Sequence, residues 1–166
     1  MSETLAIRPV GSAAEREACA KLMTESEPWR TLQRDFDTSL AVVSDPTRET
    51  YWIEYAGAWA GFLLLYLQGP FRGYIQTICL VPHVRGHGLG TAVLRWAEER
   101  IFRESPNVFL CVSDFNAGAL RLYRRLGYEL IGALPDFLVA GSAELLLRKT
   151  LGPWSSFRPA SAGPST

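Results

Sequence analysis

The alternation of apolar and polar residues divides the chain into short strands. Two aromatic and aliphatic runs meet at Ala56-Gly57, which predicts a β-hairpin. The segments GYIQTICLVP and NVFLCVS are almost continuously apolar, which is typical of central strands covered on both faces. The predicted strands are residues 4–10, the two arms of the hairpin within 49–69, and residues 73–82, 107–113, 128–134 and 142–150.

Helical spacing of apolar residues predicts four helices between these strands. The first begins after Ser12, whose hydroxyl is a plausible N-cap with Glu15 at the capping-box position, and ends near Glu25. Pro28 separates it from the second helix, because a proline disfavours helical geometry in the preceding residue. The remaining helices are predicted over residues 32–43, from 88 to about 101, and over 116–126.

The order β-α-α-β-β-β-α-β-α-β-β predicts a mixed α/β, or α+β, fold with one sheet and helices on both faces. With 166 residues, 48% of them hydrophobic, the chain has enough apolar material for one domain, which we expect over residues 1–151. Residues 152–166 are rich in proline, serine and glycine and are expected to form a flexible C-terminal tail.

Charge and cysteine content restrict the function classes. Lysine plus arginine and aspartate plus glutamate both number 17, so no general basic surface for nucleic acid is expected. The longest apolar run is too short for a membrane span, and the N-terminus lacks a secretory pattern, which predicts a cytoplasmic protein without a membrane partner. Cys19, Cys79 and Cys111 have no metal-binding spacing and are expected to be buried, reduced thiols.

Three glycines within Gly86–Gly90 stand where the third helix begins. A P-loop would require a lysine that is absent, and a dinucleotide fingerprint would require its third glycine one position later. A loop that wraps a pyrophosphate at a helix N-terminus fits better, because glycines allow close backbone approach and the helix start offers free N–H groups. A glycine-rich turn without a ligand is the alternative.

Two motifs resemble those of the GNAT-type N-acetyltransferases over roughly residues 4–150. The stretch Arg85–Gly90 fits (Q/R)-x-x-G-x-(G/A), the coenzyme A pyrophosphate signature of that superfamily. Residues 116–128 (NAGALRLYRRLGY) resemble its Asn-x-x-Ala-x-x-Leu-Tyr helix and the Gly-(Phe/Tyr) that follows. The resemblance implies a mostly antiparallel sheet of about seven strands, with a divergence between the central strands.

The resemblance also implies transfer of an acetyl group from acetyl-CoA to a primary amine by direct attack in a ternary complex, without a metal. The glycine loop would hold the pyrophosphate, the preceding strand would pair with the pantetheine arm, and Asn116 would contact that arm. Asn116 is equally suited to N-cap the following helix. The cofactor-binding residues implied in this way are Ile78, Cys79, Leu80, Arg85, Gly86, His87, Gly88, Leu89, Gly90, Thr91 and Asn116.

Tyr123 matches the family's general acid, although a core aromatic is the alternative interpretation of this residue. No carboxylate occupies residues 74–77, where some members carry a glutamate base. The base of the ribosomal-protein N-terminal acetyltransferases lies five residues before the motif asparagine, and that position is Cys111 here. The candidate bases are therefore Asp114, Glu54 and Glu27, each of which is also interpretable as a surface carboxylate.

The acceptor pocket of the superfamily is built by segments that correspond here to SEPWRT, GPFRGY and LPDF. Aromatic rings and carboxylates in these segments suit a small amine or a peptide N-terminus, and they suit plain packing equally well. The substrate-binding residues predicted from this correspondence are Glu27, Trp29, Phe71, Tyr74 and Gln76.

Other interpretations of the sequence remain open at this stage. A non-catalytic acyl-CoA-binding or sensor domain would keep the glycine loop without turnover, and a longer acyl-CoA would require a deeper slot. An acetyl-cysteine intermediate on Cys79 is less favoured, because neither His83 nor His87 is evidently placed to activate the thiol. A homodimer is a further expectation.

Overall fold

The computed structural model describes residues 4–160 and divides the chain into two compact units. Within the described residues, unit 1 comprises residues 4–66 and 75–95, and unit 2 comprises residues 67–74 and 96–160. Helix α3 (Leu89–Phe102) begins in unit 1 and ends in unit 2.

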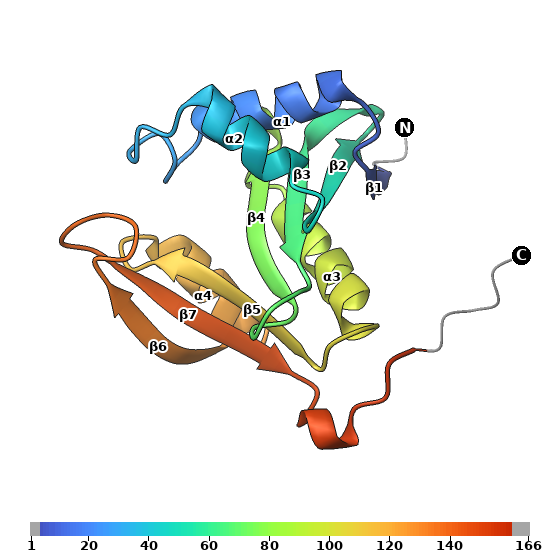
Figure 1. The fold of residues 1–166 in the computed structure, drawn as a ribbon, viewed down its shortest axis with the longest axis vertical. Helices are drawn as coiled ribbons and strands as arrows, with labels where there is room; N and C mark the ends of the chain where they lie inside the picture. Colours follow the sequence, from blue (N-terminus) through green and yellow to red (C-terminus); the bar gives the residue numbers. More distant parts are fainter. Residues whose placement is uncertain (1–3, 161–166) are drawn as a thin grey trace, which may run out of the picture. The chain divides into compact units, whose positions relative to one another are not determined.

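The strands of unit 1 follow the order β1-β2-β3-β4 (Figure 1). The pairs β1–β2 and β2–β3 are antiparallel. Ala56 and Gly57 have φ values of 51° and 80° and form the tight turn of the predicted hairpin, whose strands need a turn with positive φ at both central residues. The strands are β1 (Leu5–Pro9), β2 (Glu49–Tyr55), β3 (Ala58–Tyr66) and β4 (Tyr74–Leu80), of which Tyr74 is assigned to unit 2.

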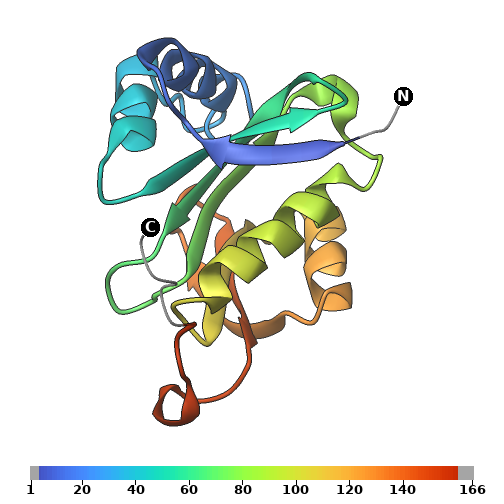
Figure 2. The same cartoon turned by 90° about the vertical axis from the view of Figure 1, so that its right-hand side faces the viewer.

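Helices lie on both faces of the unit 1 strands (Figure 2). Helices α1 (Ala13–Thr24) and α2 (Phe36–Ser44) pack together on one face, where a buried cluster fills the core. Successive strand residues point to opposite faces. Cys79 accordingly contacts Ser26 just after α1, whereas a Leu80 methyl lies 3.9 Å from the Cβ position of Gly90 in α3. The cluster comprises Cys19, Ala20, Leu22, Met23, Val43, Phe62, Leu64, Cys79 and Val81.

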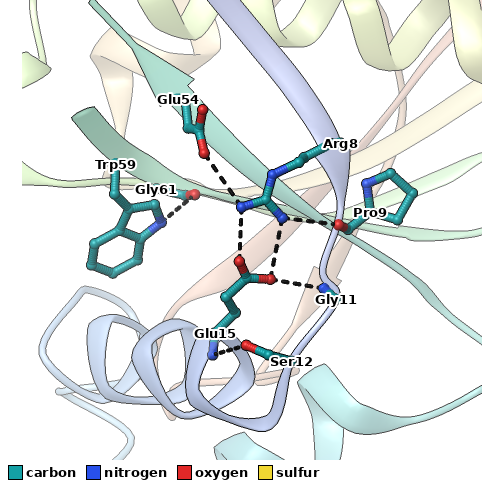
Figure 3. A network of polar contacts seen from close by, with 8 residues as sticks. All are labelled: Arg8, Pro9, Gly11, Ser12, Glu15, Glu54, Trp59 and Gly61. Atoms are coloured by element: carbon teal, nitrogen blue, oxygen red, sulfur yellow. Dashed lines mark hydrogen bonds and ion pairs between the residues drawn. The ribbon is translucent and has the colours of Figure 1, made fainter. Parts of the chain in front are cut away.

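A polar network fixes the start of α1 against β1 and β2 (Figure 3). Ser12 accepts a hydrogen bond from the Glu15 backbone N–H, as the capping-box spacing predicts. The Glu15 carboxylate in turn accepts from the Gly11 N–H at 2.7 Å and pairs with Arg8, also at 2.7 Å. These contacts lower the pKa of Glu15 to about 2, with the Arg8 hydrogen bonds as the largest cause.

The second helix begins four residues later than the sequence pattern predicts. Residues 27–33 form turns, in which the Leu32 N–H donates to the Pro28 carbonyl. Asp35 then caps α2 by accepting a hydrogen bond from the Thr38 N–H at 2.7 Å. The apolar spacing that starts at Leu32 is therefore not sufficient to extend the helix, because the capping carboxylate sets its start.

The strands of unit 2 follow the order β5-β7-β6, with both pairings antiparallel. Helix α4 (Ala117–Arg125) is followed by its C-cap Leu126 and then by Gly127, whose φ of +92° provides the predicted glycine stop. Val108, Leu110 and Leu147 are almost completely buried and contribute to the core of this unit. The strands are β5 (Asn107–Ser113), β6 (Glu129–Pro135) and β7 (Ala143–Thr150).

Part of the expected C-terminal tail makes defined contacts within unit 2. The short helix η2 (Trp154–Ser156) carries Trp154, whose ring lies 5.7 Å from the Arg72 guanidinium. The Ala160 N–H donates to the Arg103 carbonyl at 3.1 Å. The rest of the predicted tail, residues 161–166, lies outside the described residues.

These observations confirm the mixed α/β class, the seven strands and the mostly antiparallel pairing. The divergence expected between the strand that ends at Leu80 and the strand that begins at Asn107 stays a prediction. Within residues 4–160, none of the helices combines the length and the apolar character needed to cross a membrane.

Candidate functional site

The glycine loop of unit 1 exposes free backbone donors at the start of α3. Gly86 and Gly88 have φ values of 83° and 80°, a backbone geometry that favours glycine. The Ala92 N–H donates to the Gly88 carbonyl and makes the first helical hydrogen bond. The N–H groups from Leu89 to Thr91 therefore have no acceptor within the helix, and together with the helix dipole they favour an anion.

Gly90 differs from the other two glycines of the loop. It lies in the first turn of α3, and its φ is not in the left-handed region. The closest atom to an added Cβ would be a Leu80 methyl at 3.9 Å, which is an ordinary contact. Nothing in the described structure requires glycine here, although glycine weakens a helix. Close approach of a ligand to the backbone would explain why this residue is glycine.

Arg85 anchors the same loop to the end of β4. Its Nε donates a hydrogen bond of 2.8 Å to the Leu80 carbonyl. The loop position is thereby tied to the strand expected to carry the pantetheine arm, while the Arg85 side chain stays near the exposed rim. His83 and His87 are both exposed.

Cys79 of β4 is buried within unit 1, where its side chain lies beside the end of helix α1. The Cys79 thiol donates to the Ser26 hydroxyl at 3.2 Å, and Ser26 donates to the Leu22 carbonyl at 2.7 Å. Burial raises the pKa of Cys79, and it raises the pKa of Cys19 to about 12. Both thiols are therefore protonated at neutral pH, which argues against an acetyl-cysteine intermediate on Cys79.

In unit 2, Asn116 precedes α4 and caps it. Its side-chain oxygen accepts a hydrogen bond from the Ala119 N–H at 3.1 Å, and the residue is exposed. The N-cap interpretation is thus confirmed. Capping uses the carbonyl oxygen, which leaves the amide NH₂ as a donor for a ligand.

Tyr123 lies in the last turns of α4 with its ring half-buried. The ring makes an edge-to-face contact with Tyr128, with 5.8 Å between the centroids. Burial raises the pKa of Tyr123 above its ordinary value near 10, so the hydroxyl is protonated at neutral pH. This position combines a hydrophobic setting with a hydroxyl that is able to donate a proton.

Each carboxylate suggested as the base by the sequence is engaged by local partners. Asp114 accepts hydrogen bonds from the Ser142 hydroxyl and the Ala143 N–H, at 2.7 and 3.1 Å. Glu54 pairs with Arg8 at 3.3 Å (Figure 3). These contacts join structural elements to one another and give the two carboxylates structural roles.

Glu27 is the third of these carboxylates. It accepts hydrogen bonds from the Thr31 hydroxyl at 2.6 Å and from Arg30 at 3.0 Å. Both partners follow it within four residues, so the carboxylate stabilises the turn in which it lies. The hydrogen bonds, led by that of Thr31, lower the pKa of Glu27.

The residues predicted to bind the acceptor have different environments. Trp29 packs against the apolar core of unit 1, which favours the packing interpretation. Gln76 accepts a hydrogen bond of 2.7 Å from Arg48. In unit 2, Phe71 is 52% exposed and makes an edge contact with Phe109.

Tyr74, the last of the predicted acceptor residues, leads to a residue that sequence reasoning missed. Its hydroxyl interacts with the Cys111 thiol and with Glu144, and burial raises the pKa of Tyr74 well above its ordinary range. Glu144 is only 6% exposed. The sequence does point to Glu144 in one way, since it is a charged residue inside the otherwise apolar stretch AELLL. The sequence does not show, however, which strand lies beside Glu144.

Comparison with known proteins identifies the family. The acetyltransferase (GNAT) family matches residues 14–128. An uncharacterized protein of Mycobacterium leprae (strain TN) is 29% identical over 140 residues, which cover 82% of this chain and 38% of that protein. The uncharacterized N-acetyltransferase YesJ of Bacillus subtilis (strain 168) is 42% identical over 62 residues, 36% of this chain and 34% of its own. The chain thus spans little more than a third of either relative.

A further relative is covered more fully. The L-methionine sulfoximine/L-methionine sulfone acetyltransferase of Pseudomonas aeruginosa is 30% identical over 117 residues, which cover 65% of this chain and 68% of that protein. Among solved structures, the ribosomal-protein-S18-alanine N-acetyltransferase of Escherichia coli has the same fold, with a TM-score of 0.73 at 15% identity over 90% of this chain and 96% of that one. The chain belongs to the acetyltransferase (GNAT) family.

Proposed function

We propose that the protein is an acetyl-CoA-dependent N-acetyltransferase that acts on a primary amine by direct transfer. Family membership supports the reaction class. The observation that carries the proposal is the exposed loop of unit 1, where Gly90 has neither a backbone nor a packing reason to be glycine. A pyrophosphate held closely by the first turn of α3 supplies that reason.

The residues present fit coenzyme A chemically. The N–H groups from Leu89 to Thr91 and the loop amides of Gly86–Gly88 offer donors to the pyrophosphate, and the Arg85 guanidinium adds positive charge. Bound acetyl-CoA supplies the thioester to be attacked. In this proposal the amides of Ile78–Leu80 pair with the pantetheine arm, and the Asn116 amide donates to it.

Tyr123 is proposed to donate the proton that the departing sulfur requires. Its raised pKa keeps the hydroxyl protonated over the whole neutral range, which a general acid needs. The hydrophobic contact with Tyr128 holds the ring in place.

The acceptor is proposed to be a small primary amine or a peptide N-terminus. The Pseudomonas relative is named for acetylation of amino-acid derivatives, which supports a small amine. Phe71 and Tyr74 are the predicted acceptor residues whose environments in unit 2 suit such a ligand. Formation of a homodimer and a cytoplasmic location stay predictions.

A panel of amines and peptides, tested with acetyl-CoA while thiol release is followed, addresses this proposal. We expect at least one amine to raise thiol release well above background hydrolysis, and Tyr123→Phe to lower kcat by about 10²-fold or more with acetyl-CoA affinity unchanged. Acetyl-CoA binding without any productive amine would instead support a non-catalytic acyl-CoA sensor. Faster turnover with a longer acyl-CoA than with acetyl-CoA would show that the longer acyl-CoA, and not acetyl-CoA, is the donor.

A further inference from the structure

Glu144 and Ser113 lie directly opposite each other on β7 and β5. Residues opposite each other in an antiparallel pair share a face of the sheet, and residues two apart on one strand also share it. Cys111 therefore lies on this face as well. The Ser113 hydroxyl donates a hydrogen bond to the Glu144 carboxylate.

This face is the one that α3 leaves uncovered in unit 2. Lys149, also on β7, points to α3, where its ammonium pairs with Glu98. Glu144 differs from Lys149 by an odd number of positions and so faces the other way. The buried carboxylate is consequently separated from the helical core of its own unit.

Glu144 lacks a cationic partner within residues 4–160 of the structure: the groups that interact with it are the neutral side chains of Ser113, Tyr74 and Cys111. Tyr74 and Cys111 are the titratable groups that face it from the neighbouring strands, and β6 places Leu134 opposite it. On its own strand, Arg148 shares the face but lies four residues away, roughly 13 Å at the usual rise of a strand. A buried carboxylate without a cation is costly unless a ligand compensates it.

A pair of aromatic rings lies farther along the same face. Phe109 stands directly opposite Arg148, so it is as far along the strands from Glu144 as Arg148 is, and it contacts the exposed ring of Phe71 with 5.3 Å between centroids. Tyr74 adds a third ring beside Cys111. Aromatic faces and a carboxylate are the groups that bind an organic ammonium.

We propose that Glu144 binds the ammonium group of the acceptor and is the general base of the transfer. This inference rests on the proposed acetyltransferase function and deepens it by assigning the base. The acceptor class is a primary amine that arrives protonated, with an apolar portion beside the Phe71–Phe109 pair. Ser113 is a positioning residue, because it acts through its hydrogen bond to Glu144.

The proton and electron balance of the step is complete. The acceptor R–NH₃⁺ gives one proton to the Glu144 carboxylate and becomes R–NH₂. The nitrogen lone pair forms the C–N bond to the acetyl carbon, the C–S bond breaks, and the sulfur leaves with that electron pair. The sulfur takes a proton from Tyr123, which regains one as the new amide nitrogen loses its second proton through water. Glu144 then releases its proton to solvent.

The test compares wild type with Glu144→Gln, using the most active amine of the panel and an analogue fluorinated beside the amino group. Fluorination lowers the amine pKa, so the analogue needs little help in losing its proton. We expect Glu144→Gln to lower kcat/KM by about 10²-fold or more for the parent amine and much less for the analogue. Acetyl-CoA affinity, measured by calorimetry, is expected to be unchanged.

Glu129→Gln is the matched control, because it makes the same charge change at an exposed residue of β6, at the opposite end of that strand from the position beside Glu144. We expect it to keep wild-type rates. Ser113→Ala provides a second probe that does not depend on the folding of Glu144→Gln. Loss of the hydroxyl removes the hydrogen bond that orients the Glu144 carboxylate, so kcat/KM should fall for the parent amine and much less for the fluorinated analogue, whereas Ser113→Thr, which keeps a hydroxyl, should retain most of the wild-type rate.

The outcomes separate the two proposals. Rates of folded Glu144→Gln within about threefold of wild type, or equal losses for both amines, would overturn the role of Glu144 and leave the acetyltransferase function standing. Equal losses for both amines in Ser113→Ala would also overturn it. A wild-type protein that binds acetyl-CoA but acetylates no amine would overturn both proposals together.

Discussion

A Cβ atom on Gly61 of β3 would lie 2.1 Å from the carbonyl oxygen of Cys79 on β4. The same atom would lie 2.8 Å from the Leu80 Cα, and the φ of Gly61 is +144°. Backbone atoms cannot move aside as the end of a flexible side chain can. Glycine at this position therefore permits the close approach of β3 to the strand proposed to hold the pantetheine arm.

Gly61→Ala is expected to destabilise the protein by at least about 3 kcal/mol, because overlap with backbone adds to an unfavourable φ. Urea unfolding measures the loss. Gly57→Ala is the control in the same hairpin: its φ is also positive, but its Cβ would meet no atom within 4 Å. We expect that control to cost only about 1–2 kcal/mol. Equal effects of the two substitutions would contradict the steric argument.

Gly90→Ala is expected to change stability and cofactor affinity in opposite directions. Alanine in the first turn of α3 should raise the free energy of unfolding by roughly 0.5–1 kcal/mol. The added methyl should weaken acetyl-CoA binding by about 10-fold or more, because it obstructs approach to the helix N-terminus. Thermal unfolding and calorimetric titration measure the two effects.

Gly132→Ala serves as the comparison for Gly90, since a Cβ on Gly132 would meet no atom within 4 Å and this residue lies on β6. Its acetyl-CoA affinity should equal that of wild type. If Gly90→Ala binds acetyl-CoA as tightly as this control, the glycine loop does not hold the pyrophosphate.

The raised pKa of Tyr123 predicts the pH at which kcat begins to fall on the alkaline side of its pH profile. An acid must be protonated to donate, and burial moves the loss of the Tyr123 proton to pH values above its ordinary pKa near 10. Activity that depends on Tyr123 should thus be constant through the neutral range and fall only above about pH 10. The kcat profile measures this limb, and a Tyr123→Phe enzyme that retains it would show that another group is responsible.

Lys149 forms an ion pair with Glu98, with 2.7 Å between Nζ and Oε2. The same ammonium lies 5.9 Å from the centroid of the Tyr128 ring. The Glu98 side chain is 9% exposed, so removal of its partner leaves a buried charge. Lys149→Met is expected to lower the free energy of unfolding by roughly 2–4 kcal/mol near neutral pH. The double substitution Glu98→Gln with Lys149→Met should recover most of that loss, and a chemical denaturation cycle over the four proteins tests it.

The Arg8–Glu15 contact predicts an acid-dependent contribution to stability. Folding lowers the pKa of Glu15 from 4.5 to about 2. A lowered pKa in the folded state stabilises it fully above the unfolded value, and this contribution is lost as the pH falls from about 4.5 toward 2. Urea midpoints across this range should fall less steeply in Glu15→Gln than in wild type. Parallel curves for the two proteins would contradict the assignment.

Local chemistry made much of the fold predictable. The Ala56-Gly57 hairpin, the Ser12 cap and the Gly127 stop depend on neighbours within a few residues, and all are confirmed. The start of α2 was predicted too early, because the apolar pattern at Leu32 also suits turns and the Asp35 cap decides the boundary.

The sequence by itself determined the family motifs, since the glycine loop and the Asn116–Tyr123 helix are contiguous in the chain. Only the tertiary structure decided which carboxylates are engaged and which is buried without a cation. Asp114 directly follows one predicted strand and Glu144 lies within another, yet Asp114 is exposed and bound to Ser142, whereas Glu144 is buried opposite Ser113. Strand register brings together residues about thirty positions apart, and a local pattern does not contain that pairing.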